Sequence, residues 1–187
     1  KTTTATLLYQ LFTKLGYAVG LISTVVYKIA GRDIPASHTT PDVLQLNQLL
    51  ASMNDAGCEY AFMEVSSHAI VQRRVAGVQF AGGLFTNISH DHLDYHQTFK
   101  NYIQAKKGFF DALPKEAFAI TNIDDKRGAV MLQNTAAKKV SYALKNMADY
   151  KAKIIENNLS GLVLDLDNES FFARLVGGFN AYNLLAV

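Results

Sequence analysis

Short apolar segments alternate with segments of helical periodicity along most of the chain. The apolar runs are short enough for strands and are bounded by turn residues, whereas the segments between them repeat apolar residues at helical spacing. Strands that are apolar throughout must be covered on both faces, as in a parallel sheet between helices. The pattern therefore predicts an α/β fold with a mostly parallel sheet. The expected strands are 17–24, 60–65, 82–88 and 117–123, and the expected helices are 2–15, 41–57, 68–75, 98–113 and 125–134.

Two sections depart from this alternation. Residues 139–172 contain runs of alternating apolar and polar residues and a turn at Asp167-Asn168, which is typical of antiparallel strands. We expect these strands at the edge of the sheet. Residues 25–40 are less regular, and we expect a ribbon that turns at 31–33.

Composition excludes several classes of protein. With 187 residues and 49% hydrophobic residues, the chain can form one domain with a sizeable core. A formal net charge of +2 without a Lys/Arg run gives no support to nucleic-acid binding. Cys58 is the only cysteine, which favours a reducing, cytoplasmic location without an internal disulfide. No apolar run has the length of a membrane span, so we expect no membrane insertion.

Both ends of the sequence lie within helical patterns. The chain opens with Lys1 and KTTTATLLYQLF, and it closes with NAYNLLAV. We interpret residues 1–187 as one domain cut from a longer protein, with the first strand and its glycine loop missing.

Polar residues follow three of the expected strands, at 64–68, 87–94 and 122–125. In open parallel sheets, ligands bind at the carboxyl ends of the strands. We therefore expect these clusters to share one crevice.

Two clusters have the residue types of a phosphate and metal site. Lys1-Thr2-Thr3 at a helix start matches the end of a phosphate-binding loop, although the same residues are also ordinary capping chemistry. Glu64 after a buried strand could bind Mg²⁺ beside Thr2, whereas the alternative is a Glu-Ser pair that caps the next helix.

The segment from His90 to His96 contains three histidines and two aspartates. Such density is compatible with a zinc site, with a magnesium-phosphate site that uses one imidazole, or with a polar loop that caps a helix. Lys106, on the following helix, has no spacing that distinguishes it from a solvated lysine. Asn180 and Asn183 could present two amides on one helix face to adenine or ribose, or Asn180 could be a cap.

Several segments together closely resemble the Mur ligases of cell-wall synthesis, and among them those that add the third amino acid of the peptidoglycan stem. The resemblance covers essentially the whole chain in the correct order. It rests on KTTT from Lys1, TTPD from Thr39, EVSSHAIVQRR from Glu64, TNISHDHLDYH from Thr86, YIQAKKGFF from Tyr102 and GGFNAYNLLA from Gly177.

The resemblance implies a P-loop-type domain that binds ATP and Mg²⁺. Lys1 would contact the phosphates, with Thr3 beside it, and Thr2 would supply the hydroxyl for Mg²⁺. Glu64 would bind the same ion.

The resemblance also implies residues for a second metal and for the nucleotide. His92 would bind the second Mg²⁺, and Lys106 would be carbamylated and lie near it. Lys1, His92 and Lys106 would form the catalytic set, whereas Asn180 and Asn183 would contact the nucleotide. His90 and His96 would then be structural.

The implied reaction joins a diamino acid to UDP-N-acetylmuramoyl-L-Ala-D-Glu. The γ-carboxylate of D-glutamate attacks the γ-phosphorus of ATP, and the amine of meso-diaminopimelate or L-lysine attacks the resulting acyl phosphate. His38 stands where relatives often have Asn, so its role is open. The residues expected to hold the muramoyl substrate are Thr39, Thr40, Ser66, Gln72 and Arg74.

Two other functions remain open from the sequence. The chain could be a folylpolyglutamate synthetase-like ligase, which would share the phosphate loop and the metal glutamate. It could also be an inactive nucleotide-binding module as an isolated piece. In the complete bacterial protein, which we expect to be a cytoplasmic monomer, separate domains would bind the uridine nucleotide and the incoming amino acid.

Overall fold

The computed structural model describes all residues from Lys1 to Val187 and contains two compact units, Lys1–Val78 and Gln79–Val187. Each unit has its own sheet, of four strands in the first and six in the second. The predicted α/β class is confirmed, but the strands expected in one sheet lie in two. The predicted strand 60–65 is in the first unit and 82–88 is in the second.

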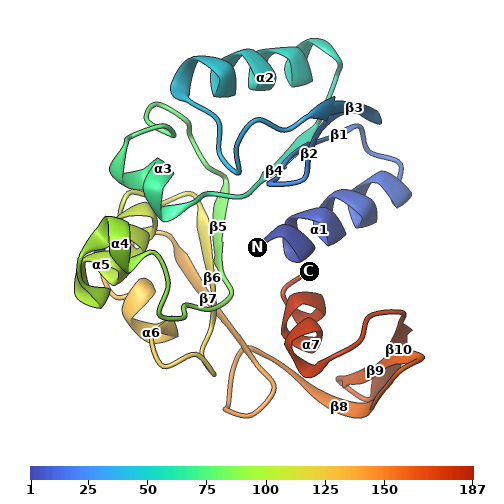
Figure 1. Cartoon of the computed structure of the whole chain (residues 1–187). Coiled ribbons are helices and arrows are strands. Elements are labelled where there is room, and N and C mark those ends of the chain that lie inside the picture. The colour runs from blue at the N-terminus through green and yellow to red at the C-terminus, as the bar shows by residue number, and fades with distance from the viewer. The chain divides into compact units, whose positions relative to one another are not determined.

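The sheet of the first unit has the order β3-β2-β1-β4. Only β1 and β4 pair in parallel, whereas β2 pairs antiparallel with both of its neighbours. Helices α1 and α2 cover opposite faces of this sheet (Figure 1). The elements are α1 (Thr2–Lys14), β1 (Val19–Ile22), β2 (Val26–Ile29), β3 (Arg32–Pro35), α2 (Val43–Asp55), β4 (Tyr60–Met63) and α3 (Ser67–Val71).

Local sequence accounts for the ends of these elements. Asp42 follows Pro41 and caps α2, because its carboxylate accepts hydrogen bonds from the backbone N–H groups of Leu44 and Gln45. Gly16 has a φ of +96° and ends α1 as predicted. The ribbon expected in 25–40 is the β2–β3 hairpin.

Alternating residues of β1 contribute to two separate cores. Val19 and Leu21 pack with α1, whereas Ile22 packs with α2. Gly20 lies on the α2 side, where an added Cβ would be 2.3 Å from the Sδ of Met53. A side chain at position 20 would therefore displace the Met53 side chain that packs α2 on the sheet.

The sheet of the second unit has the order β10-β9-β8-β7-β6-β5. Strands β5 to β8 pair in parallel, and β8 to β10 pair antiparallel. The elements are β5 (Gly82–Phe85), α4 (Leu93–His96), α5 (Phe99–Asp111), β6 (Phe118–Asn122), α6 (Gly128–Met131), β7 (Lys138–Ala143), β8 (Tyr150–Asn158), β9 (Gly161–Leu166), β10 (Glu169–Ala173) and α7 (Gly178–Leu185).

The prediction of antiparallel strands across 139–172 was wrong for β7. This strand pairs in parallel with β6, in the register Ile120↔Val140, and only the pairs from β8 onward are antiparallel. Alternation shows that a strand is half-buried, but it does not show the direction of its neighbour. The turn at Asp167-Asn168 was correct, since both residues have positive φ.

Helix α6 is shorter than the expected 125–134. The carboxylate of Asp125 accepts hydrogen bonds from the backbone N–H groups of Arg127 and Ile88, which holds the chain in a turn before the helix. Helix α4 was not expected and lies inside the histidine-rich segment.

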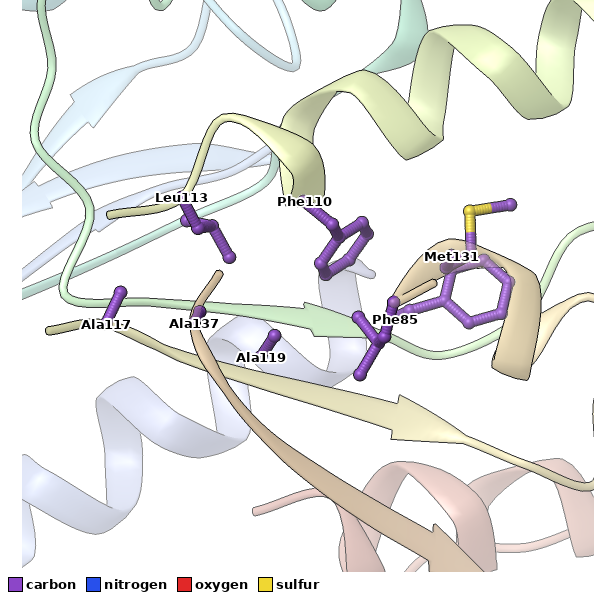
Figure 2. Close-up of a cluster of buried hydrophobic side chains, with 8 residues drawn as sticks. Phe85, Phe110, Leu113, Ala117, Ala119, Met131 and Ala137 are labelled. Atoms are coloured by element: carbon purple, nitrogen blue, oxygen red, sulfur yellow. The ribbon is translucent and has the colours of Figure 1, made fainter. Parts of the chain in front are cut away.

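The main core of the second unit lies between β5, β6 and the helices α5 and α6. Phe110 points from the end of α5 toward the strands, beside Phe85 and Met131, and Leu113, just after α5, belongs to the same cluster (Figure 2). Helix α7 packs elsewhere, through Ala181 on Leu162 and Leu164 of β9. No helix of either unit has the length and apolarity that a bilayer span requires.

Candidate functional site

The buried Glu64 is the centre of a cluster of oxygen atoms in the first unit. The Thr2 hydroxyl donates to Oε2 of Glu64 at 3.0 Å, and the Thr24 hydroxyl donates to the same oxygen at 3.1 Å. The backbone N–H of Thr24 donates to Oε1 at 2.9 Å. Glu64 follows β4 and Thr24 follows β1, so parallel pairing places both at one edge of the sheet.

The cluster has the chemistry of a magnesium site at a phosphate-binding helix end. One carboxylate and two hydroxyls are hard oxygen donors, which Mg²⁺ prefers. The first turn of α1 begins at Thr2, and the N-terminus of a helix favours anions. Lys1 and Thr3 are on the same turn. The residues present therefore fit Mg²⁺ with a phosphate, and the roles of Lys1, Thr2 and Glu64 in binding them stay a prediction.

Thr40 joins the loops after β4 and before α2. Its hydroxyl donates to the backbone oxygen of Glu64 at 2.7 Å and accepts from the N–H of Ser66 at 3.1 Å. Its carbonyl accepts from Nη1 of Arg74 at 2.9 Å. Since Thr40 is almost completely buried, this geometry favours a role in holding the loops. Ser66 also caps α3 by accepting from the N–H of Ala69.

Gln72 and Arg74 line a pocket of about 380 Å³ together with His38, Asp42 and Val43. The guanidinium of Arg74 donates through Nε to Oε1 of Gln72 at 2.8 Å. The pKa of Asp42 is lowered, first by the hydrogen bond from Gln45 and also by the charge of Arg74. The pocket thus offers a cation and an amide to an anionic ligand.

Thr39 and the adjacent His38 border the Glu64 cluster and the pocket. The hydroxyls of Thr24 and Thr39 are 3.1 Å apart and hydrogen-bonded, which links Thr39 to the Glu64 cluster. The backbone of His38 is held by Tyr27, whose hydroxyl donates to the His38 carbonyl at 2.6 Å. Thr39 is therefore linked to the cluster, whereas the adjacent His38 lines the pocket.

The side chains expected at the second metal site lie around the ring of Tyr102 on α5. Its centroid lies 5.9 Å from the His92 ring and 4.9 Å from Nζ of Lys106. The His96 ring stacks on Tyr102 at 5.0 Å. Burial and then the charge of Asp91 raise the pKa of Tyr102, so its hydroxyl stays protonated. His92 and Lys106 thus share one aromatic neighbour.

The three histidines do not converge on a single point. His90 stacks on Phe99 at 4.0 Å, whereas His96 is buried against Tyr102. No group of three His, Cys, Asp or Glu side chains in the chain is placed to ligate a metal. The zinc interpretation therefore has no geometric support, and the stacking agrees with structural roles for His90 and His96.

Lys106 and Lys107 have different environments. Lys107 is buried, and its Nζ is 2.7 Å from both carboxylate oxygens of Asp111. Lys106 is half-buried and lies over Tyr102. The geometry thus favours Lys106 over Lys107 as the lysine beside His92.

Asn180 and Asn183 form a hydrogen-bonded pair on α7. The Asn183 amide donates to Oδ1 of Asn180 at 2.9 Å, and the Asn180 amide donates to the carbonyl of Val176 at 2.9 Å. Tyr182, which precedes Asn183, donates through its hydroxyl to Asp124 at 2.9 Å. The two predicted amides are therefore adjacent on α7. The Asn180 amide also binds the backbone just before this helix begins.

Of the three polar clusters expected to share a crevice, two follow neighbouring strands of the same sheet. Strands β5 and β6 are adjacent and parallel, and the Asn122 amide donates to the carbonyl of Thr86 at 2.9 Å. The third cluster, around Glu64, belongs to the first unit.

Some residues with defined places in these sites had no role assigned from the sequence. Thr24 follows a strand, so the strand-end rule could have found it, whereas Asp124 lies in the 122–125 cluster that this rule did find but had no role of its own. No sequence signal separates Tyr102 or Tyr182 from ordinary core tyrosines. Asp42 was recognised within TTPD, but not as part of a pocket wall.

Known proteins resemble the chain over its whole length. It is 62% identical over 187 residues to a UDP-N-acetylmuramoyl-L-alanyl-D-glutamate--2,6-diaminopimelate ligase of Cytophaga hutchinsonii, covering 100% of this chain and 38% of that protein. A ligase with the same name from Phocaeicola vulgatus is 57% identical, with 100% and 39% covered. The chain thus spans well under half the length of these relatives.

Solved structures give the same result. A structure of a UDP-N-acetylmuramoyl-L-alanyl-D-glutamate--2,6-diaminopimelate ligase has a TM-score of 0.88 and 30% identity, covering 100% of this chain and 39% of its own. MurF from Acinetobacter baumannii has a TM-score of 0.73 and 19% identity, with 99% and 38% covered, which concerns the fold alone. The family described as Mur ligase middle domain matches residues 1–187. The chain therefore belongs to the Mur ligase middle domain family.

Proposed function

We propose that the chain is the ATP-binding middle domain of a ligase that joins meso-diaminopimelate to UDP-N-acetylmuramoyl-L-Ala-D-Glu in peptidoglycan synthesis. The observation that carries this proposal is the 62% identity over the whole chain to a protein named as such a ligase. Further similar curated relatives also have names with 2,6-diaminopimelate, which favours this amino acid over L-lysine.

The complete protein would contain domains that residues 1–187 do not include. Its relatives are more than twice as long as the matched region. We infer that an N-terminal domain binds the uridine nucleotide and that a C-terminal domain binds the incoming amino acid. The complete protein would act as a monomer in the bacterial cytoplasm, and residues 1–187 alone would not ligate.

In the first unit, the Glu64 cluster would hold the phosphates and one Mg²⁺. Glu64, Thr2 and Thr24 supply the oxygen donors, and Lys1 and Thr3 are on the adjacent helix turn. Bound Mg²⁺ would neutralise charge on the phosphate oxygens. Lys1 would bind the terminal phosphate and stabilise the charge that develops during transfer.

In the second unit, His92 and Lys106 would serve a second Mg²⁺. An unmodified ammonium would repel a divalent cation, whereas a carbamate on Lys106 would present two oxygen atoms to it. The half-buried position over Tyr102 leaves Lys106 accessible for this modification. The burial of Lys107 against Asp111 disfavours the neighbouring lysine.

The pocket beside α2 would bind the muramoyl substrate. Arg74 can hold a carboxylate or a phosphate with two parallel hydrogen bonds, and Gln72 fixes the guanidinium. Ser66 and Thr39 would contact the same substrate. Thr40 would act through the loops that it holds, because its hydroxyl already bonds to Glu64 and Ser66.

The proposed reaction has two displacements. A γ-carboxylate oxygen of D-glutamate attacks the γ-phosphorus of ATP, the bond to the bridging oxygen breaks, and ADP leaves with that electron pair. The amine of diaminopimelate then attacks the acyl carbon, and phosphate leaves. Phosphoryl transfer depends on positioning and charge neutralisation, so Lys1 and Arg74 have suitable chemistry. Asn180 and Asn183 would contact the nucleotide.

A folylpolyglutamate synthetase-like activity is the second candidate. A structure of E. coli FolC in complex with DHPP and ADP has a TM-score of 0.66 at 18% identity, a likeness of fold. The much higher identity to the diaminopimelate ligases argues against this candidate.

A coupled assay of the complete protein tests the proposal. We expect phosphate release that requires both UDP-N-acetylmuramoyl-L-Ala-D-Glu and meso-diaminopimelate, with L-lysine far less active. Phosphate release that is independent of the muramoyl substrate would contradict the ligase function. Activity with a folate substrate in its place would favour the second candidate.

A further inference from the structure

Asp124, just beyond the end of β6, is held by an unusual number of hydrogen bonds. Its carboxylate accepts from the backbone N–H groups of Leu144, Lys145 and Asn146 at 2.8 to 2.9 Å. The side-chain amide of Asn146 adds another at 2.8 Å. Burial alone raises the pKa of Asp124, but these hydrogen bonds outweigh it and lower the pKa to about 2. The carboxylate is therefore ionised and fixed in direction.

Tyr182 on α7 binds this fixed carboxylate. Its hydroxyl donates to Oδ2 of Asp124 at 2.9 Å. Burial, followed by the bond to Asp124, raises the pKa of Tyr182 to about 12, so the hydroxyl remains a donor at neutral pH. The interaction connects residues that are 58 positions apart in the sequence.

The rest of α7 is attached to a different part of the sheet. Ala181 packs on Leu162 and Leu164 of β9, and the N–H of Gly177 donates to Oδ1 of Asn157 at 3.2 Å. These contacts join α7 to the antiparallel strands. Asp124 and Tyr182 instead join it to the carboxyl end of the parallel strand β6, where ligands bind in such sheets.

The two attachments together fix the rotation of α7 about its own axis. Asn180 and Asn183 are on this helix, on either side of Tyr182 in sequence, and their amides are hydrogen-bonded to each other. A rotation of the helix would therefore turn both amides together. Because hydrogen bonds are directional, a small rotation would weaken their contacts with a ligand.

We propose that Asp124 and Tyr182 are positioning residues for ATP, which hold α7 so that Asn180 and Asn183 face the nucleotide. This inference rests on the nucleotide-binding role proposed above for the two asparagines. Asp124 and Tyr182 do not themselves contact the nucleotide in this proposal. Their effect should appear in the affinity for ATP and not in the chemical step.

The test compares two tyrosine variants of the complete protein. Tyr182→Phe removes the bond to Asp124 and keeps the ring. Tyr142→Phe is the matched control, since Tyr142 is a buried tyrosine of the same unit whose hydroxyl has no hydrogen-bond partner. For Tyr182→Phe we expect the KM for ATP and the Kd for ADP to rise about tenfold, as for loss of one bond to a charged group. The kcat and the KM for the muramoyl substrate should stay within about twofold.

Further measurements complete the design. Tyr142→Phe should leave both KM values and kcat unchanged. Asp124→Asn should share the rise in the KM for ATP, and Asn183→Ala tests the underlying nucleotide role. Thermal unfolding of each variant reports any loss of folding.

Each unfavourable outcome has a distinct meaning. If Asn183→Ala raises the KM for ATP and Tyr182→Phe does not, the positioning role is wrong and the nucleotide role stands. If neither variant changes the KM for ATP or the Kd for ADP, both roles are wrong. If Tyr182→Phe lowers kcat and raises both KM values together with a loss of thermal stability, the contact is only structural.

Discussion

Replacing Glu64 by Gln tests whether this carboxylate binds a metal or has only a structural role. The side chain is only 3% exposed, so a change of shape at this position would disturb the packing, and Gln avoids that change. The variant removes the negative charge and keeps one oxygen atom.

The hydrogen bonds of Glu64 allow the effect on folding to be estimated. The Gln carbonyl can accept from the N–H of Thr24, as the Glu carboxylate does. The hydroxyls of Thr2 and Thr24 donate to Glu64, but each can rotate and accept from the new amide. Since the number of hydrogen bonds is retained, we expect a change in the free energy of unfolding of about 1 kcal/mol or less. The melting temperature should then shift by no more than about 4 °C.

The effect on Mg²⁺ should be much larger. The Glu64 cluster contains one carboxylate, and an amide cannot replace its charge. Loss of partners that merely orient a metal ligand costs about 10- to 100-fold in affinity, so loss of the ligand itself should cost at least about 100-fold.

The assay is the Mg²⁺ dependence of ATP binding and ligation in the complete protein, with thermal unfolding measured in parallel. Glu59→Gln is the matched control, because Glu59 is exposed and lies at the other end of β4. A Glu64→Gln variant that melts far below the wild type and keeps its Mg²⁺ dependence would refute the reasoning. Glu64 would then be a structural residue of the loop before α3.

Three other variants test the site and the fold. Lys106→Ala should abolish ligation, and short carboxylic acids that replace the carbamate should restore part of the activity. Lys107→Ala should instead lower stability without such rescue, because the Asp111 carboxylate loses its ion pair. An unchanged rate for Lys106→Ala would remove this lysine from the site. Because the pKa of Asp124 is lowered from 3.8 to about 2, its contribution to stability is complete above pH 4 and is lost as the pH falls through 2. Between pH 4 and pH 2, the melting temperature of Asp124→Asn should therefore fall less than that of the wild type. An equal fall in both proteins would contradict this. Met131→Ala should lower the free energy of unfolding by about 2–5 kcal/mol in urea titrations, since Met131 is fully buried, while Met147→Ala, at an exposed position, should be neutral.

The local elements followed from the sequence because their signals are local. The apolar spacing of α1, the Pro41-Asp42 start of α2 and the Asp167-Asn168 turn each depend on neighbouring residues, and all three are present. The motifs from Lys1 and Glu64 also predicted an oxygen-rich cluster at a helix start, which the structure contains.

The pairing of strands did not follow from the sequence. The division into two sheets and the parallel direction of β7 depend on which distant strands meet, and an alternating pattern is compatible with either direction. The length of α6 was overestimated because a side chain, Asp125, captures backbone N–H groups before the helix.

The sequence by itself determined the α/β alternation, the family pattern and the residue types available for phosphate and metal chemistry. Tertiary structure decided which of those residues have the required surroundings. Thr24 reaches Glu64 across 40 positions, and Tyr182 reaches Asp124 across 58. It also distinguished the buried Lys107 from Lys106, which are adjacent in sequence. The physical reason is that burial and hydrogen bonding depend on contacts between segments far apart in the chain, which local periodicity does not contain.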